Sequence, residues 1–250
     1  MWKAAWEAYI LFREPYDNVL DAMINVYKEA VERIGGVSTD HRHTSHVEDH
    51  LAQHLMAFYW RGKLALEGED RILSIFFERA SDELRGVALE FIGRSLKHTA
   101  EPIESSIAQR IVSLWQWRLG QGQKNPALHK AEMANFGWWF ASGKLDEAWA
   151  MQNLVTVLKL AGRVEPDFLV MERLADVADD MTQEVLSCVR MMIESDKNGW
   201  DIPGWEKELR HILGVAMNSG ILELQRAAST MINRLGERGY LNFRDLLGTI

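Results

Sequence analysis

Five histidines lie close together in the first quarter of the chain, and their spacing could support metal chemistry. They are His41, His43, His46, His50 and His54. On a helix, the last three share one face, where a pair of imidazoles can bind a metal ion. The zinc-protease motif HExxH needs a glutamate directly after its first histidine, and Val47 stands there instead. We therefore predict a polar helix face that titrates at about pH 6.5 rather than a metal site.

An aromatic segment in the middle of the chain, residues 136–140, is the second candidate for function. Trp138 and Trp139 are adjacent, so on a helix their side chains point about 100° apart and cannot both enter one core layer. One of the two rings could therefore face a concave binding surface, together with Trp117; packing between helices is the alternative. We predict Trp117, Trp138 and Trp139 as binding residues.

Acidic residues are concentrated between Glu165 and Asp196, where nine of them occur with only two arginines. The segment therefore has a charge of −7, close to the −8 of the whole chain. A solvated helical face explains such a segment, and so does a contact surface for a basic partner protein. On the second interpretation, we predict Asp176 and Asp180 as binding residues.

Motifs of known catalytic sites are missing from the sequence. It has no Ser-His-Asp order, no G-x-S-x-G and no phosphate-binding glycine loop, because Gly35-Gly36 and Gly120-x-Gly122 follow predicted helices rather than strands. The single cysteine, Cys188, excludes an intramolecular disulfide, and its apolar neighbours indicate a buried thiol rather than a nucleophile. We predict no cofactor, and the sequence favours a protein that is not an enzyme.

The composition is that of a folded protein. Apolar residues make up 47% and charged residues 26% of 250, which excludes a disordered chain. No stretch of about 18 apolar residues could span a membrane, and the first residues lack the apolar core of a signal peptide. The single cysteine fits a reducing, cytoplasmic location. A net charge of −8 and a pI of about 5.5 disfavour nucleic acid as a partner.

The spacing of the apolar residues, near 3.6 for most of the chain, predicts an all-α protein of roughly ten to twelve helices. Proline is rare, with 5 residues, and glycines such as Gly68 and Gly162 mark predicted helix ends. We expect a single helical-repeat domain over residues 1–250. It consists of an N-terminal hairpin (1–36), a polar loop (37–45) and stacked hairpins (46–250), one helix of which spans 126–141. Short loops make successive helices antiparallel.

An internal repeat decides the expected architecture. Residues 82–92 align with residues 222–232, and residues 180–190 fit the same frame. The pairs Val87-Ala88 and Ala227-Ala228 lie in mid-helix, with an isoleucine or methionine four residues on. Small residues at such positions let neighbouring helices approach closely.

In these segments the chain resembles the HEAT/armadillo class of helical repeats, over about residues 70–240. Repeat spacings of about 41 to 54 residues fit the two-helix units of that class. The proline and Asp/Arg positions that mark clearer HEAT repeats are largely missing from this sequence. The resemblance implies a right-handed α-α superhelix whose inner helices offer an extended binding surface, and it implies no chemistry.

The leading functional hypothesis is therefore a scaffold that binds a protein or peptide, as an accessory or sensor region of a larger bacterial protein. The alternative is an enzyme, because some HEAT-like proteins of this size are DNA glycosylases that use Trp, Asp and Arg on a basic face. The tryptophan content invites this comparison and the acidic charge opposes it. A self-assembling structural element is a third hypothesis. The partner's identity and the oligomeric state stay open.

Overall fold

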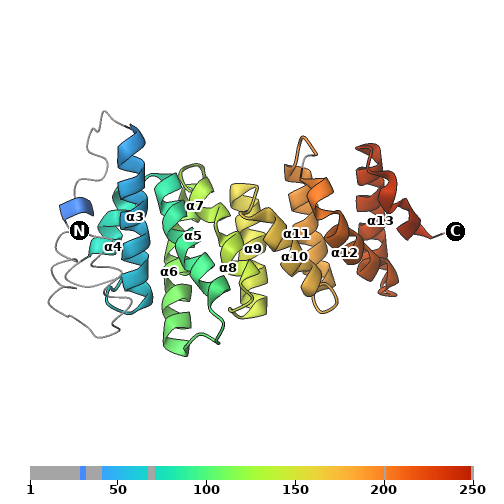
Figure 1. Ribbon diagram of the computed structural model, residues 1–250. Helices are drawn as coiled ribbons and strands as arrows, with labels where there is room; N and C mark the ends of the chain where they lie inside the picture. Colours follow the sequence, from blue (N-terminus) through green and yellow to red (C-terminus); the bar gives the residue numbers. More distant parts are fainter. Residues whose placement is uncertain (1–28, 32–40, 67–70, 200, 249–250) are drawn as a thin grey trace. The chain divides into compact units, whose positions relative to one another are not determined.

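The computed structural model describes residues 29–31, 41–66, 71–199 and 201–248. Regular secondary structure in these ranges is entirely helical, which confirms the all-α prediction (Figure 1). None of the helices described is long and apolar enough to cross a membrane. The chain divides into two compact units, Met1–Ser81 and Asp82–Ile250, which are considered separately below.

The first unit contains two described helices, α3 (His41–Trp60) and α4 (Ile72–Arg79). The hairpin expected over residues 1–36 lies outside the described residues, apart from 29–31, which are helical. Because α3 begins at His41, residues 41–45 are helical and not part of the predicted loop. The apolar side chains of Leu51, Leu55, Phe58 and Tyr59 in this helix are buried.

The second unit consists of nine described α-helices and three short 3-10 helices. The α-helices are α5 (Asp82–His98), α6 (Ser105–Lys124), α7 (Lys130–Ala134), α8 (Phe136–Ala141), α9 (Glu147–Ala161), α10 (Asp167–Asp176), α11 (Thr182–Ser195), α12 (Glu206–Asn218) and α13 (Leu222–Glu237). The 3-10 helices are η1 (Pro126–Leu128), η2 (Ile202–Trp205) and η3 (Leu241–Leu247).

The helix expected over residues 126–141 is broken into η1, α7 and α8, so that prediction is wrong. At the second break, the Asn135 side-chain amide donates to the carbonyl oxygen of Ala131 at 2.9 Å. In a regular helix the backbone N–H of residue 135 would donate to that carbonyl, so the side chain competes with the helix. Gly137 follows, and a Cβ there would lie 2.5 Å from the carbonyl oxygen of Glu165. Glycine therefore lets α8 approach the segment before α10.

Helix α5 packs along α7 and α8, and it runs in the same direction as these two helices. Trp139 donates its indole N–H to the carbonyl oxygen of Leu89 at 2.8 Å, and Lys97 donates to the carbonyl oxygen of Ala141 at 3.4 Å. Residue numbers therefore rise together on both sides of the interface, which is the signature of parallel neighbours.

The later helices continue this arrangement of contacts between alternate elements. In one row, α8 contacts α10 and α10 contacts α12; in the other, α9 contacts α11 and α11 contacts α13. Figure 1 shows these helices following one another in chain order. Between α9 and α11, the Cys188 sulfur lies 3.8 Å from that of Met151, and between α11 and α13, Arg234 pairs with Glu194.

Candidate functional site

Trp139, one of the predicted binding residues, lies in the core. Its side chain is fully buried, its ring lies 5.6 Å from that of Trp115 and 6.3 Å from that of Phe136, and its N–H is already bonded to Leu89. A partner cannot reach it. Trp138 points elsewhere, as the angle between adjacent residues requires: it is half-buried, and the Arg94 guanidinium lies 5.3 Å from its ring centre.

Trp117 is half-buried on α6, where it covers a cluster of buried charges. The Arg118 guanidinium lies 4.7 Å from the centre of its ring. Arg118 itself is buried and donates from Nε to the Glu132 carboxylate at 2.5 Å. The position of Trp117 is therefore explained by packing over this cluster.

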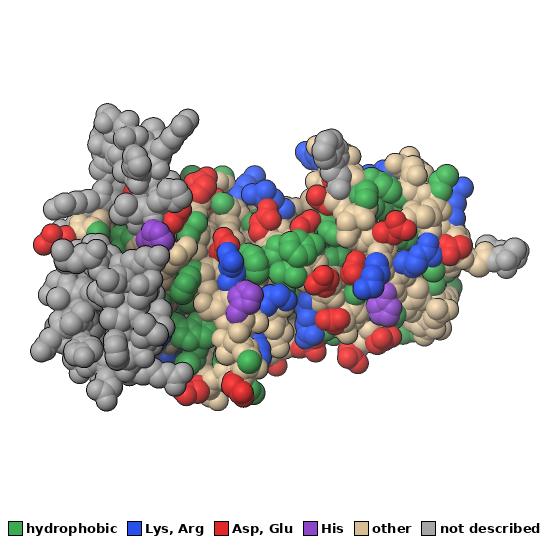
Figure 2. Space-filling model, in the orientation of Figure 1, with side chains coloured by type: hydrophobic (Ala, Val, Ile, Leu, Met, Phe, Trp, Pro, Cys, Tyr) green, Lys and Arg blue, Asp and Glu red, His purple; other side chains and the backbone are tan. Residues whose placement is uncertain are grey.

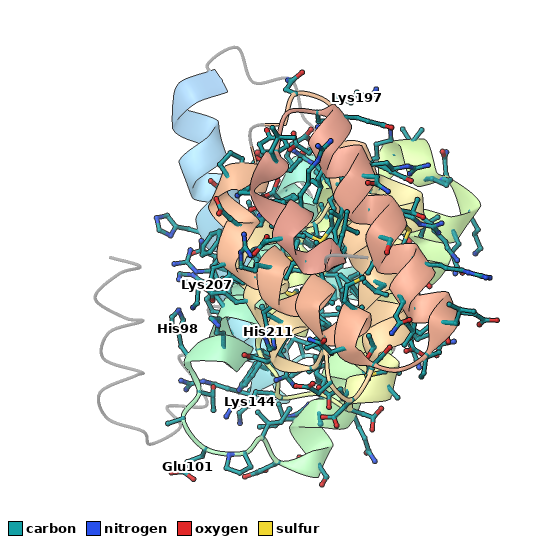
Figure 3. The ribbon with its side chains drawn as sticks, turned by 90° about the vertical axis from the view of Figure 1, so that its right-hand side faces the viewer. His98, Glu101, Lys144, Lys197, Lys207 and His211 are labelled. Atoms are coloured by element: carbon teal, nitrogen blue, oxygen red, sulfur yellow. The ribbon has the colours of Figure 1, made fainter. Side chains whose placement is uncertain are left out.

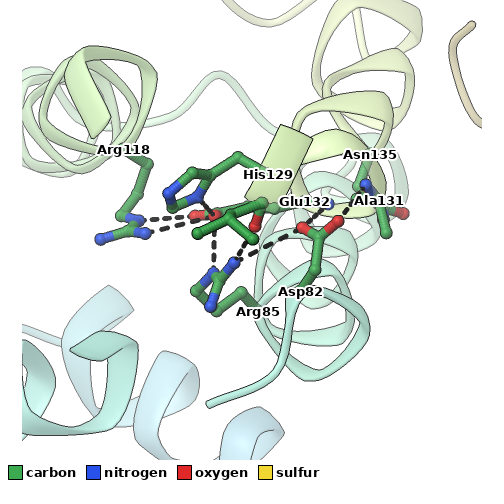
Figure 4. Close-up of polar contacts among 8 residues, drawn as sticks. Asp82, Arg85, Arg118, His129, Ala131, Glu132 and Asn135 are labelled. Carbon is green, nitrogen blue, oxygen red and sulfur yellow. Dashed lines mark hydrogen bonds and ion pairs between the residues drawn. The ribbon is translucent and has the colours of Figure 1, made fainter. Parts of the chain in front are cut away.

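The cluster centres on Glu132 of α7, whose side chain is fully buried (Figure 4). Its carboxylate contacts Arg118, the Nε of Arg85 at 2.8 Å and the Nδ1 of His129 at 2.6 Å. Burial alone would raise the pKa of Glu132, but the hydrogen bonds and charges of Arg118, with His129 and Arg85, hold that pKa below its ordinary value.

Asp82 extends the cluster by capping a helix that is distant in sequence. Its carboxylate accepts the backbone N–H groups of Ala131 at 2.8 Å and Glu132 at 3.0 Å, in the first turn of α7. It also lies 3.6 Å from Arg85. The charges of three helices thus compensate one another with little solvent access, so we interpret the cluster as a structural lock rather than a catalytic site.

The predicted acidic residues lie together at the turn between α10 and α11. Asp176 ends α10 and Asp180 lies in the turn, and both are exposed. The nearest cation, Arg173, is 4.0 Å from Asp176 and already pairs with Glu147 at 2.7 Å. Asp180 and its neighbour Asp179 make no hydrogen bond or ion pair to another described residue. This turn is therefore a surface of largely uncompensated negative charge.

Two hollows border this part of the second unit. One, which we call the α11–α13 groove, has a volume of about 440 Å³ and lies between those helices. Its apolar lining consists of Leu186, Ile221, Leu224, Ala227 and Met231. The other, which we call the α12 pocket, has a volume of about 640 Å³ and lies between the α10–α11 turn, α12 and the start of α13. Its lining includes Asp179, His211, Gly214, Val215, Asn218, Ile221 and Leu224.

The two hollows meet at the first turn of α13, because Ile221 and Leu224 line both. Ile221 is 54% exposed and its neighbour Leu222 is 58% exposed. Apolar side chains exposed beside a hollow are typical of a binding surface. Sequence analysis missed these residues, although an Ile-Leu pair directly after the Ser219-Gly220 helix break was a usable signal.

The predicted binding residues thus divide into two groups. Asp176 and Asp180 lie at the turn that borders the α12 pocket, whereas Trp117, Trp138 and Trp139 belong to α6 and α8. On the face of the second unit shown in Figure 2, basic side chains alternate with acidic ones around a central apolar patch. Figure 3 shows His211 and Lys207 of α12 on the same side of the unit.

The histidine cluster is described in part. Side chains of His41, His43 and His46 lie outside the described residues. His50 is exposed and His54 half-buried, with 6.3 Å between their ring centres. Burial, with a smaller contribution from His50, lowers the pKa of His54. Among the side chains that the structure describes, no group of three His, Cys, Asp or Glu is placed to hold a metal ion.

Comparison with known proteins gives no relative. No protein-family model matches the chain, and no curated protein and no solved structure matches it significantly. The candidate function therefore rests on the geometry of the second unit.

Proposed function

We propose that the second unit is a right-handed α-α superhelix of the HEAT/armadillo kind and that the protein is a scaffold that binds a protein or peptide. Two observations support this architecture. Alternate helices contact one another, as α8 does α10 and α11 does α13. Helices α5 and α8 also pack side by side with their chains running in the same direction. Stacked helical hairpins produce this pattern, since each unit buries its apolar face against the next.

One observation carries the binding function. The α11–α13 groove has an apolar lining, and no described element covers it. Its rim holds charged residues from both helices, including Arg190, Glu223 and Arg234. Apolar lining with a polar rim is the usual composition of protein-binding surfaces, where the lining supplies affinity and the rim orientation. A partner helix or extended segment laid along the groove would bury this lining.

Site-specific photocrosslinking of the full chain in its native cells tests this function. Ala227 is exposed and lines the groove, so a photoreactive benzoyl-phenylalanine in its place should capture a discrete protein partner. The matched control is the same replacement of Asn233, an exposed residue of α13 that does not line the groove. A crosslinked species that appears equally from both positions, or from neither, would refute the scaffold function.

A further inference from the structure

A glycine of α12 lines the α12 pocket and exposes its backbone there. Gly214 lies within α12 and lines the pocket, and a Cβ added there would meet no atom within 4 Å. Glycine weakens a helix relative to alanine, and no packing neighbour requires it at this position. Its effect is to leave space in which the main chain of a bound segment can approach the helix closely.

Polar side chains near Gly214 in the α12 pocket are available to a ligand. Asp179, His211 and Asn218 line the pocket, and their side chains make no hydrogen bond or ion pair to another described residue. Asn218 offers both a donor and an acceptor, and the imidazole of His211 offers two ring nitrogens for hydrogen bonding. These are the groups that satisfy the N–H and C=O groups of a peptide main chain.

The pocket also has an apolar lining. It consists of Val215 of α12, Ile221 just before α13 and Leu224 of α13, and the Ile221 side chain is more than half exposed. An aliphatic side chain from a bound segment would remove this surface from water, which favours binding.

The charge at the pocket favours a basic ligand. Asp179 lines it, and two exposed carboxylates flank that residue, Asp176 at the end of α10 and Asp180 in the turn. On the other side, the charge of Arg210 is already compensated, because its Nη1 lies 2.7 Å from the Asp245 carboxylate. The uncompensated charge at the pocket is therefore negative.

We propose that the α12 pocket binds a peptide segment of a partner protein in which an aliphatic residue stands next to lysine or arginine. The aliphatic side chain contacts Ile221 and Leu224, the main chain crosses Gly214, and the basic side chain pairs with Asp179 or Asp180. This inference rests on the proposed scaffold function and adds the chemistry of the partner to it.

A random dodecapeptide library displayed on phage, selected on the full chain, tests the inference. Enriched peptides should combine aliphatic residues with lysine or arginine. Synthesised with a fluorescent label, they should bind with a Kd of about 1–100 μM by fluorescence anisotropy, and binding should weaken between about 50 and about 300 mM NaCl. Enrichment of acidic or purely apolar peptides would overturn the charge assignment.

Two variants locate the binding. Gly214→Leu adds a side chain whose Cβ meets no atom within 4 Å, and it should weaken binding at least about tenfold, since it occupies the path of the main chain. The double variant Asp179→Asn with Asp180→Asn should weaken binding and remove most of its salt dependence. The matched control is Gly120→Leu on α6, where an added Cβ also meets nothing within 4 Å and which lines neither hollow.

The outcomes separate this inference from the function on which it rests. Undiminished binding to Gly214→Leu, with the same circular dichroism spectrum as the original protein, would place the peptides elsewhere and overturn the inference while leaving a peptide-binding scaffold. A change in oligomeric state on the same substitution would assign the pocket to a second copy of the chain and also overturn it. If no peptide is enriched, the inference fails, and crosslinking from Ala227 then decides the scaffold function separately.

Discussion

The carboxylate of Glu132 in α7 accepts a hydrogen bond from the Nε of Arg118 in α6 at 2.5 Å, and both side chains are shielded from water. A second guanidinium, that of Arg85 in α5, contacts the same carboxylate. Three helices are therefore joined through one buried anion. Because a buried cation without a partner is costly, the contribution of Glu132 is best measured by its removal.

We expect Glu132→Gln to destabilise the protein by about 3–5 kcal/mol, because it removes the buried counter-charge of Arg118 and leaves Arg85 with only the more distant Asp82. Urea unfolding of the full chain, followed by tryptophan fluorescence, measures this loss. Glu90→Gln is the matched control, since Glu90 pairs with Arg94 at 3.2 Å on the surface, and it should cost less than about 1 kcal/mol. Equal effects of the two substitutions would show that the cluster is not a lock.

The same carboxylate predicts how stability changes with acid. Its pKa is lowered in the folded state, from an ordinary value of 4.5. Its contribution is therefore fully present above pH 4.5 and is lost as the pH falls through the lower folded-state pKa. Urea midpoints measured from about pH 7 down to about pH 3 should fall more steeply for the original protein than for Glu132→Gln. Parallel curves would contradict the pKa direction.

Cys188 should be inert to alkylation in the folded protein. Burial, reinforced by the charge of Glu184, raises the pKa of its thiol to about 12, so almost no thiolate exists near neutral pH. Iodoacetamide at about pH 8 should leave the folded chain unmodified by mass spectrometry and alkylate it fully in urea. Rapid modification without denaturant would show that α9 and α11 do not enclose the thiol.

A DNA-acting enzyme is the alternative function for a helical-repeat chain rich in tryptophan. The net charge of −8 and the alternation of charges in Figure 2 lead us to expect no such binding. A labelled duplex of about 20 base pairs should show no anisotropy change with the full chain at about 150 mM NaCl. Tight binding that weakens steeply with added salt would favour the DNA-acting enzyme over the protein-binding scaffold.

Glycine and proline positions in the sequence predicted where many of the helices begin and end. Gly162 ends α9 with φ 77°, a conformation that glycine adopts without strain, so this helix end could be predicted from one residue. The divergence of Trp138 and Trp139 also followed from helix geometry alone, although which ring is buried did not. That choice depends on α5, since Leu89 supplies the acceptor for Trp139.

Features that join distant segments could not be predicted. Glu132 and Arg85 are 47 residues apart, and nothing in either local pattern identifies its partner. The helix break at Asn135 depends on one side-chain hydrogen bond. The helix propensity of asparagine is an average over many proteins and does not say where this bond forms. The α12 pocket is likewise formed by three separate segments, so Asp179 was assigned to an acidic stretch without its relation to Gly214.

The cap that Asp82 provides for α7 has a consequence for biosynthesis. Asp82 accepts N–H groups from residues 49 and 50 positions later, and α7 has only five residues, too few to nucleate alone in water. The short helix α7 therefore forms only when α5 is in place to accept these N–H groups. A ribosome delivers α5 before α7, so at this point the order of translation matches the order in which the structure can grow.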